Sequence, residues 1–244
     1  MKINPTKLLM VYSAVLTAAF VFSGGPGAVA AGGAASGNAK FDTLDVKRIN
    51  LREDDGTLRM VISNSSHAPG IIVKGVDRPH PSGNRGAGIL FFNNEGTENG
   101  GLTFGGKTEN GKVSGNGHLS FDQYEQDQVI QLTQSEYDGK RWAAMVINDR
   151  PDGRLDFDLA AKLAKLPAGA ERDKFIAKYR DDGLAGRQRL YVGKTATRDS
   201  TVMLSDALGR PRIVLKVAPD GASTIDFLDE KGGVVRSLNP TAQP

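Results

Sequence analysis

Three carboxylates near the middle of the chain are the residues best suited to chemistry. Glu95, Glu98 and Asp122 lie within residues 91–128, the stretch that is densest in acidic and amide side chains. Glycosidases use two carboxylates that face each other across the scissile bond, one as the acid and the other as the nucleophile. These three residues are therefore the catalytic candidates for a hydrolase that acts on extracellular or cell-wall glycans.

A second cluster in the same stretch suits a metal ion. Asp122, Glu125 and Asp127 offer oxygen ligands of the kind that Ca²⁺ prefers. Their segment, DQYEQD, lacks the D-x-D-x-D-G loop of an EF-hand. Asn, Glu and Gly are also common in turns, and Asp and Glu often line the exposed face of a strand. We favour that simpler interpretation and expect no cofactor beyond this candidate Ca²⁺ site.

No catalytic or cofactor motif in the sequence rises above chance. A G-x-S-x-G elbow is absent. Gly101–Thr108 (GLTFGGKT) has the spacing of a phosphate-binding loop, but we expect its glycines to form turns that flank a strand. The absence of cysteine excludes thiol nucleophiles, disulfides and zinc–thiolate sites. The three histidines, His67, His80 and His118, share no metal-ligand spacing. These absences favour a binding or structural role over catalysis.

Composition and charge suit a soluble globular body and disfavour nucleic acid as a partner. Of the 244 residues, 24% are charged and 39% are apolar, which is enough to bury a core. Residues 1–30 contain Lys2 and Lys7 and no acid, so the remainder has 29 basic residues against 28 acidic ones. Phosphate binding needs a concentrated basic face, and none is present. We therefore expect no nucleic-acid partner.

The N-terminus carries an export signal. Lys2 and Lys7 precede an uncharged apolar run at residues 8–22, and Ala28-Val29-Ala30 supplies small residues for cleavage before Ala31. Residues 1–30 are thus a signal peptide or, if uncleaved, an N-terminal membrane anchor through residues 8–22. The run has about 15 residues, against roughly 20 for a spanning helix. The sequence predicts an exported protein, either periplasmic or secreted, or anchored to the cytoplasmic membrane.

A recurring pattern of strand, acidic Gly turn and Arg-bearing strand predicts stacked β-hairpins. It appears as INLREDDGTLRMVIS at Ile49–Ser63, as VMLSDALGRPRIVLKV at Val202–Val217 and more loosely as IDFLDEKGGVVRSL at Ile225–Leu238. The expected fold is mainly β, an irregular antiparallel sheet or sandwich of stacked hairpins with a short helical hairpin insertion. Pairing between the N-terminal and C-terminal copies is one arrangement that the pattern allows.

The rest of the chain divides by composition into further regions. We expect a flexible linker at residues 31–40, a β-rich region at 41–155, a helical insertion at 156–182 and C-terminal hairpin repeats at 183–240. In the insertion, apolar residues recur at helical spacing over Asp156–Tyr179, and Pro167 divides it into two short helices with Asp156 as a cap.

The alternation in the central strands also predicts which side chains share the core. One face would hold the large apolar residues Leu90, Phe92, Leu102, Phe104, Leu119 and Phe121, with Phe91 pointing away. The Gly- and Asn-rich stretches Asn93–Gly101 and Lys107–Gly117 are expected to be polar loops. Loops on a rigid scaffold often carry recognition residues, so these two stretches are a candidate binding surface.

The central block resembles a group of bacterial proteins. The segments GILFFNNEGTENGGLTFGG (Gly88–Gly106), GHLSFDQYEQDQ (Gly117–Gln128), GRPRIVLKVAPDG (Gly209–Gly221) and FLDEKG (Phe227–Gly232) resemble an uncharacterised family of exported or membrane-anchored proteins. The resemblance covers roughly Phe41–Leu238 and implies a location in the cell envelope. It implies no activity, substrate or site residue.

Two classes of function follow from the sequence. The favoured one is an exported, non-enzymatic β-rich protein of the cell envelope with a binding or structural role toward an unknown envelope or extracellular ligand. The alternative is the glycan hydrolase that would use Glu95, Glu98 or Asp122.

Overall fold

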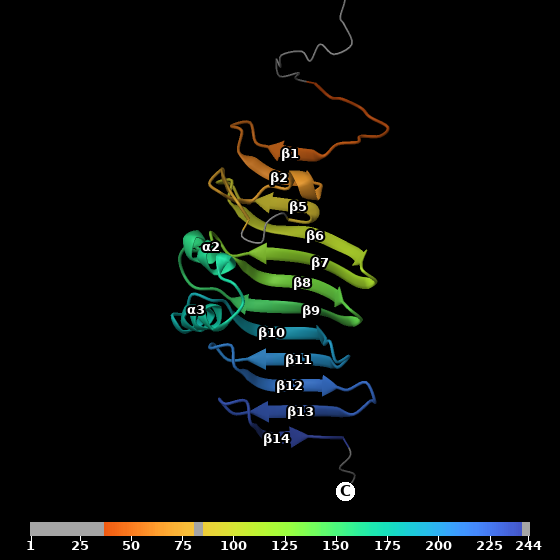
Figure 1. Ribbon diagram of the computed structural model, residues 1–244, viewed down its shortest axis with the longest axis vertical. Helices are drawn as coiled ribbons and strands as arrows, with labels where there is room; N and C mark the ends of the chain where they lie inside the picture. The colour runs from red at the N-terminus through yellow and green to blue at the C-terminus, as the bar shows by residue number, and fades with distance from the viewer. Residues whose placement is uncertain (1–36, 81–84, 241–244) are drawn as a thin grey trace, which may run out of the picture. The chain divides into compact units, whose positions relative to one another are not determined.

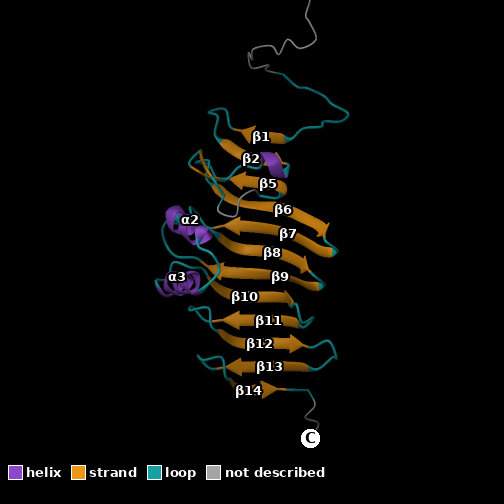
Figure 2. Ribbon diagram, viewed as in Figure 1, coloured by secondary structure: helices purple, strands orange, loops and turns teal. Residues whose placement is uncertain are grey.

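Twelve strands pair in one antiparallel sheet (Figures 1 and 2). The computed structural model describes residues 37–80 and 85–240. The main sheet consists of β1 (Arg48–Arg52), β2 (Leu58–Ser63), β5 (Ala87–Phe92), β6 (Glu98–Glu109), β7 (Lys112–Asp122), β8 (Gln128–Tyr137), β9 (Lys140–Asp149), β10 (Arg187–Lys194), β11 (Ser200–Ser205), β12 (Pro211–Val217), β13 (Ser223–Leu228) and β14 (Val234–Leu238). A 3-10 turn, η1 (Ser65–His67), and a two-stranded sheet of β3 (Ile71–Val73) and β4 (Val76–Arg78) separate β2 from β5.

The strands follow one another in sequence order across the sheet, apart from the small β3–β4 pair. The mainly β, antiparallel prediction is confirmed, and the architecture within the described residues is a sheet, not a sandwich. Each copy of the recurring pattern forms one hairpin, namely β1–β2, β11–β12 and β13–β14. The idea that the N-terminal copy pairs with the C-terminal copies is wrong, because β1 and β14 lie at opposite edges of the sheet.

One turn geometry recurs in seven of the connections. In each turn, the N–H of the first residue donates to the carbonyl of the fifth residue. The carbonyl of the first residue accepts a hydrogen bond from the N–H of the fourth residue. These turns begin at Glu53, Asn93, Gln123, Thr195, Asp206, Ala218 and Asp229. In six of them the fourth residue has a positive φ, as at Gly56 (88°) and Arg198 (73°). Glycine adopts this conformation without steric cost, which explains the acidic Gly turns of the sequence.

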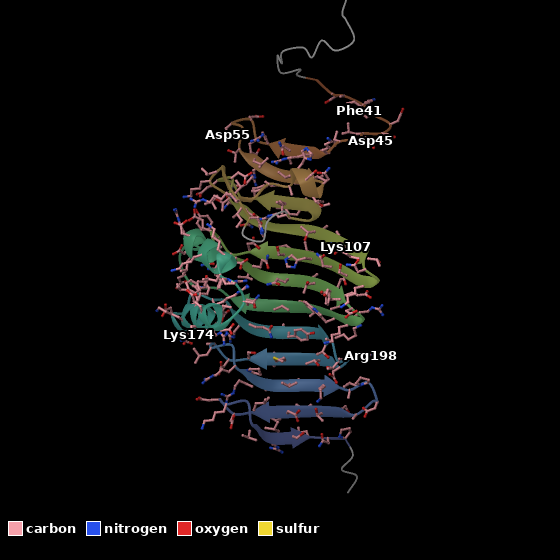
Figure 3. The ribbon with its side chains drawn as sticks, viewed as in Figure 1. Phe41, Asp45, Asp55, Lys107, Lys174 and Arg198 are labelled. Carbon is pink, nitrogen blue, oxygen red and sulfur yellow. The ribbon has the colours of Figure 1, made fainter. Side chains whose placement is uncertain are left out.

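The two predicted loops contain much more strand than expected. Lys107–Gly117 forms the turn end of the β6–β7 hairpin, and its turn is only Asn110-Gly111, both with positive φ as a tight hairpin turn requires. The other stretch, Asn93–Gly101, is a short turn followed by the start of β6. These two turns join opposite ends of β6, so a single binding surface made from both is wrong. Figure 3 shows Asp55 at one end of the strands and Lys107 at the other.

The helical insertion folds as predicted into two short helices. α2 (Phe157–Lys165) is capped by Asp156, whose Oδ1 accepts the N–H of Leu159 at 2.9 Å. The chain then passes Pro167 and enters α3 (Ala170–Asp181). Lys162 Nζ lies 5.6 Å from the centre of the Phe175 ring, a cation–π contact between the helices. In Figure 1 both helices are drawn at the left-hand ends of the central strands, α2 at the height of β7 and α3 at the height of β9 and β10.

Within the described residues, neither helix combines the length and the apolar character that crossing a membrane requires. The predicted signal peptide or anchor, with its apolar run at residues 8–22, lies outside the described residues.

The register places apolar side chains in two straight rows on one face of the sheet. The first, which we call the aliphatic row, contains one residue from each strand of the main sheet: Ile49, Ile62, Ile89, Leu102, Leu119, Leu132, Met145, Val192, Val202, Leu215, Ile225 and Leu238. The second row, two residues along each strand, reads Leu51, Met60, Phe91, Gly100, Phe121, Ile130, Ile147, Leu190, Leu204, Ile213, Phe227 and Arg236. We call this side of the sheet the apolar face.

The predicted core assignment is wrong for the central strands. Leu90 and Phe92 are buried on the opposite side of the sheet. Phe104 is 61% exposed and Phe121 is 53% exposed, and both lie on the apolar face together with Phe91. The alternation fixes which residues of one strand share a face, but the turn between two strands decides which faces coincide.

The buried core is small and lies beneath the β3–β4 sheet. It consists of Leu58, Val61, Ile72, Leu90 and Phe92. Ile72 of the small sheet covers β2 and β5 of the large one, and Val61 is completely shielded from solvent. Burial of these side chains holds the small sheet against the large one. The small sheet therefore lies on the face opposite the apolar face.

Shortening Val61 tests this arrangement. We expect Val61→Ala to lower the free energy of unfolding by about 2 kcal/mol, because it removes methyl groups from a packed site and leaves a cavity. Urea titration followed by circular dichroism measures the change. Val235→Ala is the matched control, since Val235 is 66% exposed and its shortening should cost less than about 0.5 kcal/mol. Equal losses in both variants would contradict the proposed core.

Candidate functional site

A cavity of about 460 Å³ opens on the side of the sheet that carries the small β3–β4 pair. Its walls come from β3 and β4, from β5, β6 and β7, from the turn after β7 and from the segment that follows β9. Lys74 holds the small sheet in place by donating its N–H to Thr97 Oγ1 at 3.0 Å. The segment after β9 is attached through the Leu155 N–H, which donates to the Glu125 carbonyl at 2.9 Å.

The floor of the cavity is a line of three residues in register, of which Gly101 and Ser120 are small. Leu90, Gly101 and Ser120 lie opposite one another on β5, β6 and β7. A Cβ atom at Gly101 would lie 2.7 Å from Leu90 Cδ2, so only glycine leaves room for this leucine. His118, Ser120 and Asp122 alternate along β7 and therefore point to the same side.

Glu98 is held by an arginine from the segment between β4 and β5. Arg85 donates from Nη1 and Nη2 to the two carboxylate oxygens at 2.7 and 2.6 Å. The exposed fractions of the two side chains are only 12% and 16%. A two-point contact of this kind compensates both charges away from bulk water, and it occupies both oxygens of Glu98.

Glu125 is the most deeply buried acid of the site, with a side chain only 4% exposed. Lys74 Nζ lies 3.0 Å from Oε1, and Arg154 pairs with Oε2. Burial alone would raise the pKa of Glu125, but the hydrogen bond from Lys74 and the charge of Arg154 outweigh it and lower the pKa. Glu125 is therefore ionised and fully engaged by cations.

Asp127 and Glu95 are also paired. Arg150 Nη1 lies 3.1 Å from Asp127 Oδ2 at the edge of the cavity. Glu95 lies outside the cavity lining, where it accepts a hydrogen bond from the Tyr124 hydroxyl at 2.8 Å. Lys74 Nζ is 3.7 Å from the same carboxylate oxygen of Glu95, so this lysine lies between Glu95 and Glu125.

Asp122 differs from the other carboxylates. Burial raises the pKa of Asp122 to about 7, and the negative charges of Glu98 and Asp127 add to the effect. Its Oδ1 is buried and has no hydrogen-bond partner among the described residues. The same is true of His118 Nε2 and Arg85 Nε. Burial lowers the pKa of His118, so this imidazole is neutral at pH 7.

The structure brings four of the five predicted site residues together. Glu98, Asp122, Glu125 and Asp127 line the same cavity, while Glu95 does not. Among the described residues, however, no three His, Cys, Asp or Glu side chains are grouped closely enough to hold a metal ion, so the Ca²⁺ site stays a prediction without geometric support.

The sequence patterns did not indicate the basic residues of the site or His118. Arg85 and Arg154 come from irregular segments, and Lys74 comes from a tight turn at positive φ, so no periodic pattern marks them. His118 had a usable signal, because it shares the alternation of Ser120 and Asp122 on β7.

Comparison with known proteins gives no further guide to this site. No protein-family model matches the chain, and no match was found among curated proteins or among solved structures. Function has to be argued from the cavity and from the sequence.

The raised pKa of Asp122 makes a testable prediction about stability. Between about pH 4 and 7 the folded chain keeps a proton on Asp122 that the unfolded chain has lost, so this residue reduces stability as pH rises. We expect Asp122→Asn to match the wild type near pH 4 and to be more stable by on the order of 4 kcal/mol at about pH 8, since the pKa is raised from 3.8 to about 7 and one pKa unit corresponds to about 1.4 kcal/mol.

Urea titrations of both proteins across this pH range measure the difference. The matched control is Asp152→Asn, at an exposed position in the segment after β9. A difference between Asp122→Asn and wild type that stays constant with pH would show that Asp122 ionises normally in the folded chain.

Proposed function

We propose that this chain is an exported protein of the cell envelope that binds a neutral, hydroxyl-rich ligand in the cavity and carries out no reaction. One observation supports this most directly: side chains that line the cavity bear three buried polar atoms that have neither a hydrogen bond nor an ion pair among the described residues. These are Asp122 Oδ1, His118 Nε2 and Arg85 Nε. Buried polar groups nearly always have a hydrogen-bond partner, and a bound ligand would supply one.

The charges of the lining indicate a neutral ligand. The arginines Arg78, Arg85 and Arg154 balance the carboxylates Glu98, Glu125 and Asp127 when Asp122 holds its proton. A protonated acid, a neutral imidazole and a guanidinium N–H together donate and accept hydrogen bonds without adding net charge. A cavity of about 460 Å³ falls within the usual range for small ligands, and a saccharide of one or two rings fits this chemistry and size.

The glycan hydrolase is the second candidate, and one observation favours it. Asp122, which is protonated up to about pH 7, lines the same cavity as Glu98, and its pKa responds to the charge of Glu98. In a glycosidase, Asp122 would be the general acid and Glu98 the ionised carboxylate. Against this role, Arg85 donates a hydrogen bond to each oxygen of Glu98, which stabilises the carboxylate and weakens it as a nucleophile toward a sugar.

Removing the imidazole tests the binding proposal. We expect His118→Ala to weaken the binding of neutral saccharides by about fivefold, because a lost hydrogen bond costs roughly 1 kcal/mol. Isothermal titration calorimetry with N-acetylglucosamine oligomers and with maltose measures the affinity. His67→Ala is the matched control, since His67 is exposed on η1 away from the cavity.

Two outcomes would contradict this proposal. Failure of every saccharide to bind the wild type would exclude the ligand class. Release of reducing ends from the same saccharides, lost in both Glu98→Gln and Asp122→Asn, would establish the hydrolase instead.

Export rests on the N-terminal pattern and has its own test. We expect the mature chain to begin at Ala31, because small residues at Ala28 and Ala30 suit signal-peptide cleavage. Intact-mass analysis of the protein from a periplasmic extract measures the N-terminus. An intact N-terminus in the membrane fraction would indicate the anchored form, and recovery in the cytoplasm alone would exclude export.

A further inference from the structure

The apolar face remains open to solvent across the whole width of the sheet. In the aliphatic row Ile49 is 40% exposed, Leu132 is 47% exposed and Leu238 is 44% exposed, from the first strand to the last. The small β3–β4 sheet and the cavity lie on the other side, with Val61, Leu90 and Ser120. No element among the described residues shields this row at either edge or at its centre.

The size of the band matches one half of a stable protein interface. Twelve strands spaced about 4.8 Å apart extend roughly 50 Å, and two rows of side chains cover a band about 14 Å wide. The resulting area is roughly 700 Å², whereas soluble monomers seldom expose continuous apolar patches above about 600 Å². A standard interface buries about 800 Å² on each partner.

The chemistry of the band suits a protein surface of the same shape. Among the 24 positions of the two rows, Arg236 is the only charged residue and Gly100 the only one without a side chain. At the margin, Glu136 and Arg141 form an ion pair of 2.7 Å. An apolar centre with a polar rim is typical of protein interfaces, whereas attraction to anionic lipid relies on unpaired basic clusters.

We propose that two copies of this chain pack their apolar faces together and form a two-layered β-sandwich. Another copy supplies a straight apolar row of equal length by symmetry, as a two-fold interface requires. Packed sheets lie about 10 Å apart with their inner side chains interdigitated, which would bury the aliphatic rows of both copies. The cavities then face outward on both sides of the dimer and stay open to ligand.

Placing a charge in the aliphatic row tests the dimer. Sedimentation velocity on the full chain should give twice the mass of one chain for the wild type. We expect Leu132→Glu to sediment as a monomer, because the interface would have to bury an unpaired carboxylate. Gln131→Glu is the matched control, since it introduces the same charge in the same strand on the opposite face, and it should remain dimeric.

A second measurement covers the case in which Leu132→Glu does not fold. The chain contains no cysteine, so Leu132→Cys and Gln131→Cys each introduce a single thiol. In the dimer, maleimide should label Leu132→Cys more slowly than Gln131→Cys, and dilution should remove the difference.

Several results would overturn the proposal. These are a monomeric wild type, a trimer, a dimer that survives Leu132→Glu with unchanged circular dichroism, or equal labelling of the two thiols at every concentration. A monomer that co-sediments with phosphatidylcholine vesicles would assign the apolar face to lipid instead.

Discussion

The register of the hairpins is the constraint on which the rest of this structure depends. Side chains alternate with a period of two, so a slip of one residue in any turn would move all later strands to the wrong face. The chain avoids such slips with one repeated turn geometry and with tight two-residue turns such as Asn110-Gly111. The result is a row of aliphatic residues that passes through every strand from Ile49 to Leu238 without interruption.

The same register creates the site on the other face. It aligns Leu90, Gly101 and Ser120 as a floor and directs His118 and Asp122 to one side. Charged residues from irregular segments then complete the walls. Burying a charge is expensive unless it is paired, and Glu98 and Glu125 each have cations within contact distance. Asp122 has no such partner and keeps its proton instead, which gives the cavity its donor.

The two faces of the sheet therefore have different relations to solvent. On one face a small added sheet encloses a cluster of five buried apolar residues, counted in the described part of the chain, beside a polar cavity. On the other face the chain leaves its longest apolar surface uncovered. A single-layered sheet buries little apolar area on its own, so pairing with another copy would supply the second layer that sheet architectures normally have. Ligand binding on one face and self-association on the other would then proceed without competing for surface.

The sequence by itself determined the local elements of this protein. The acidic Gly turns predicted hairpins, Asp156 and Pro167 predicted the two helices, and the density of acids at residues 91–128 predicted four residues that do line one cavity. These features depend on neighbours in the chain, so they can be recognised locally. Tertiary structure alone decided that Phe104 and Phe121 face solvent while Leu90 and Phe92 are buried, and that Arg85 and Arg154 reach the acids from distant segments. The physical reason is that strand register and charge pairing are settled between segments, by turn geometry and by the cost of burying an unpaired charge.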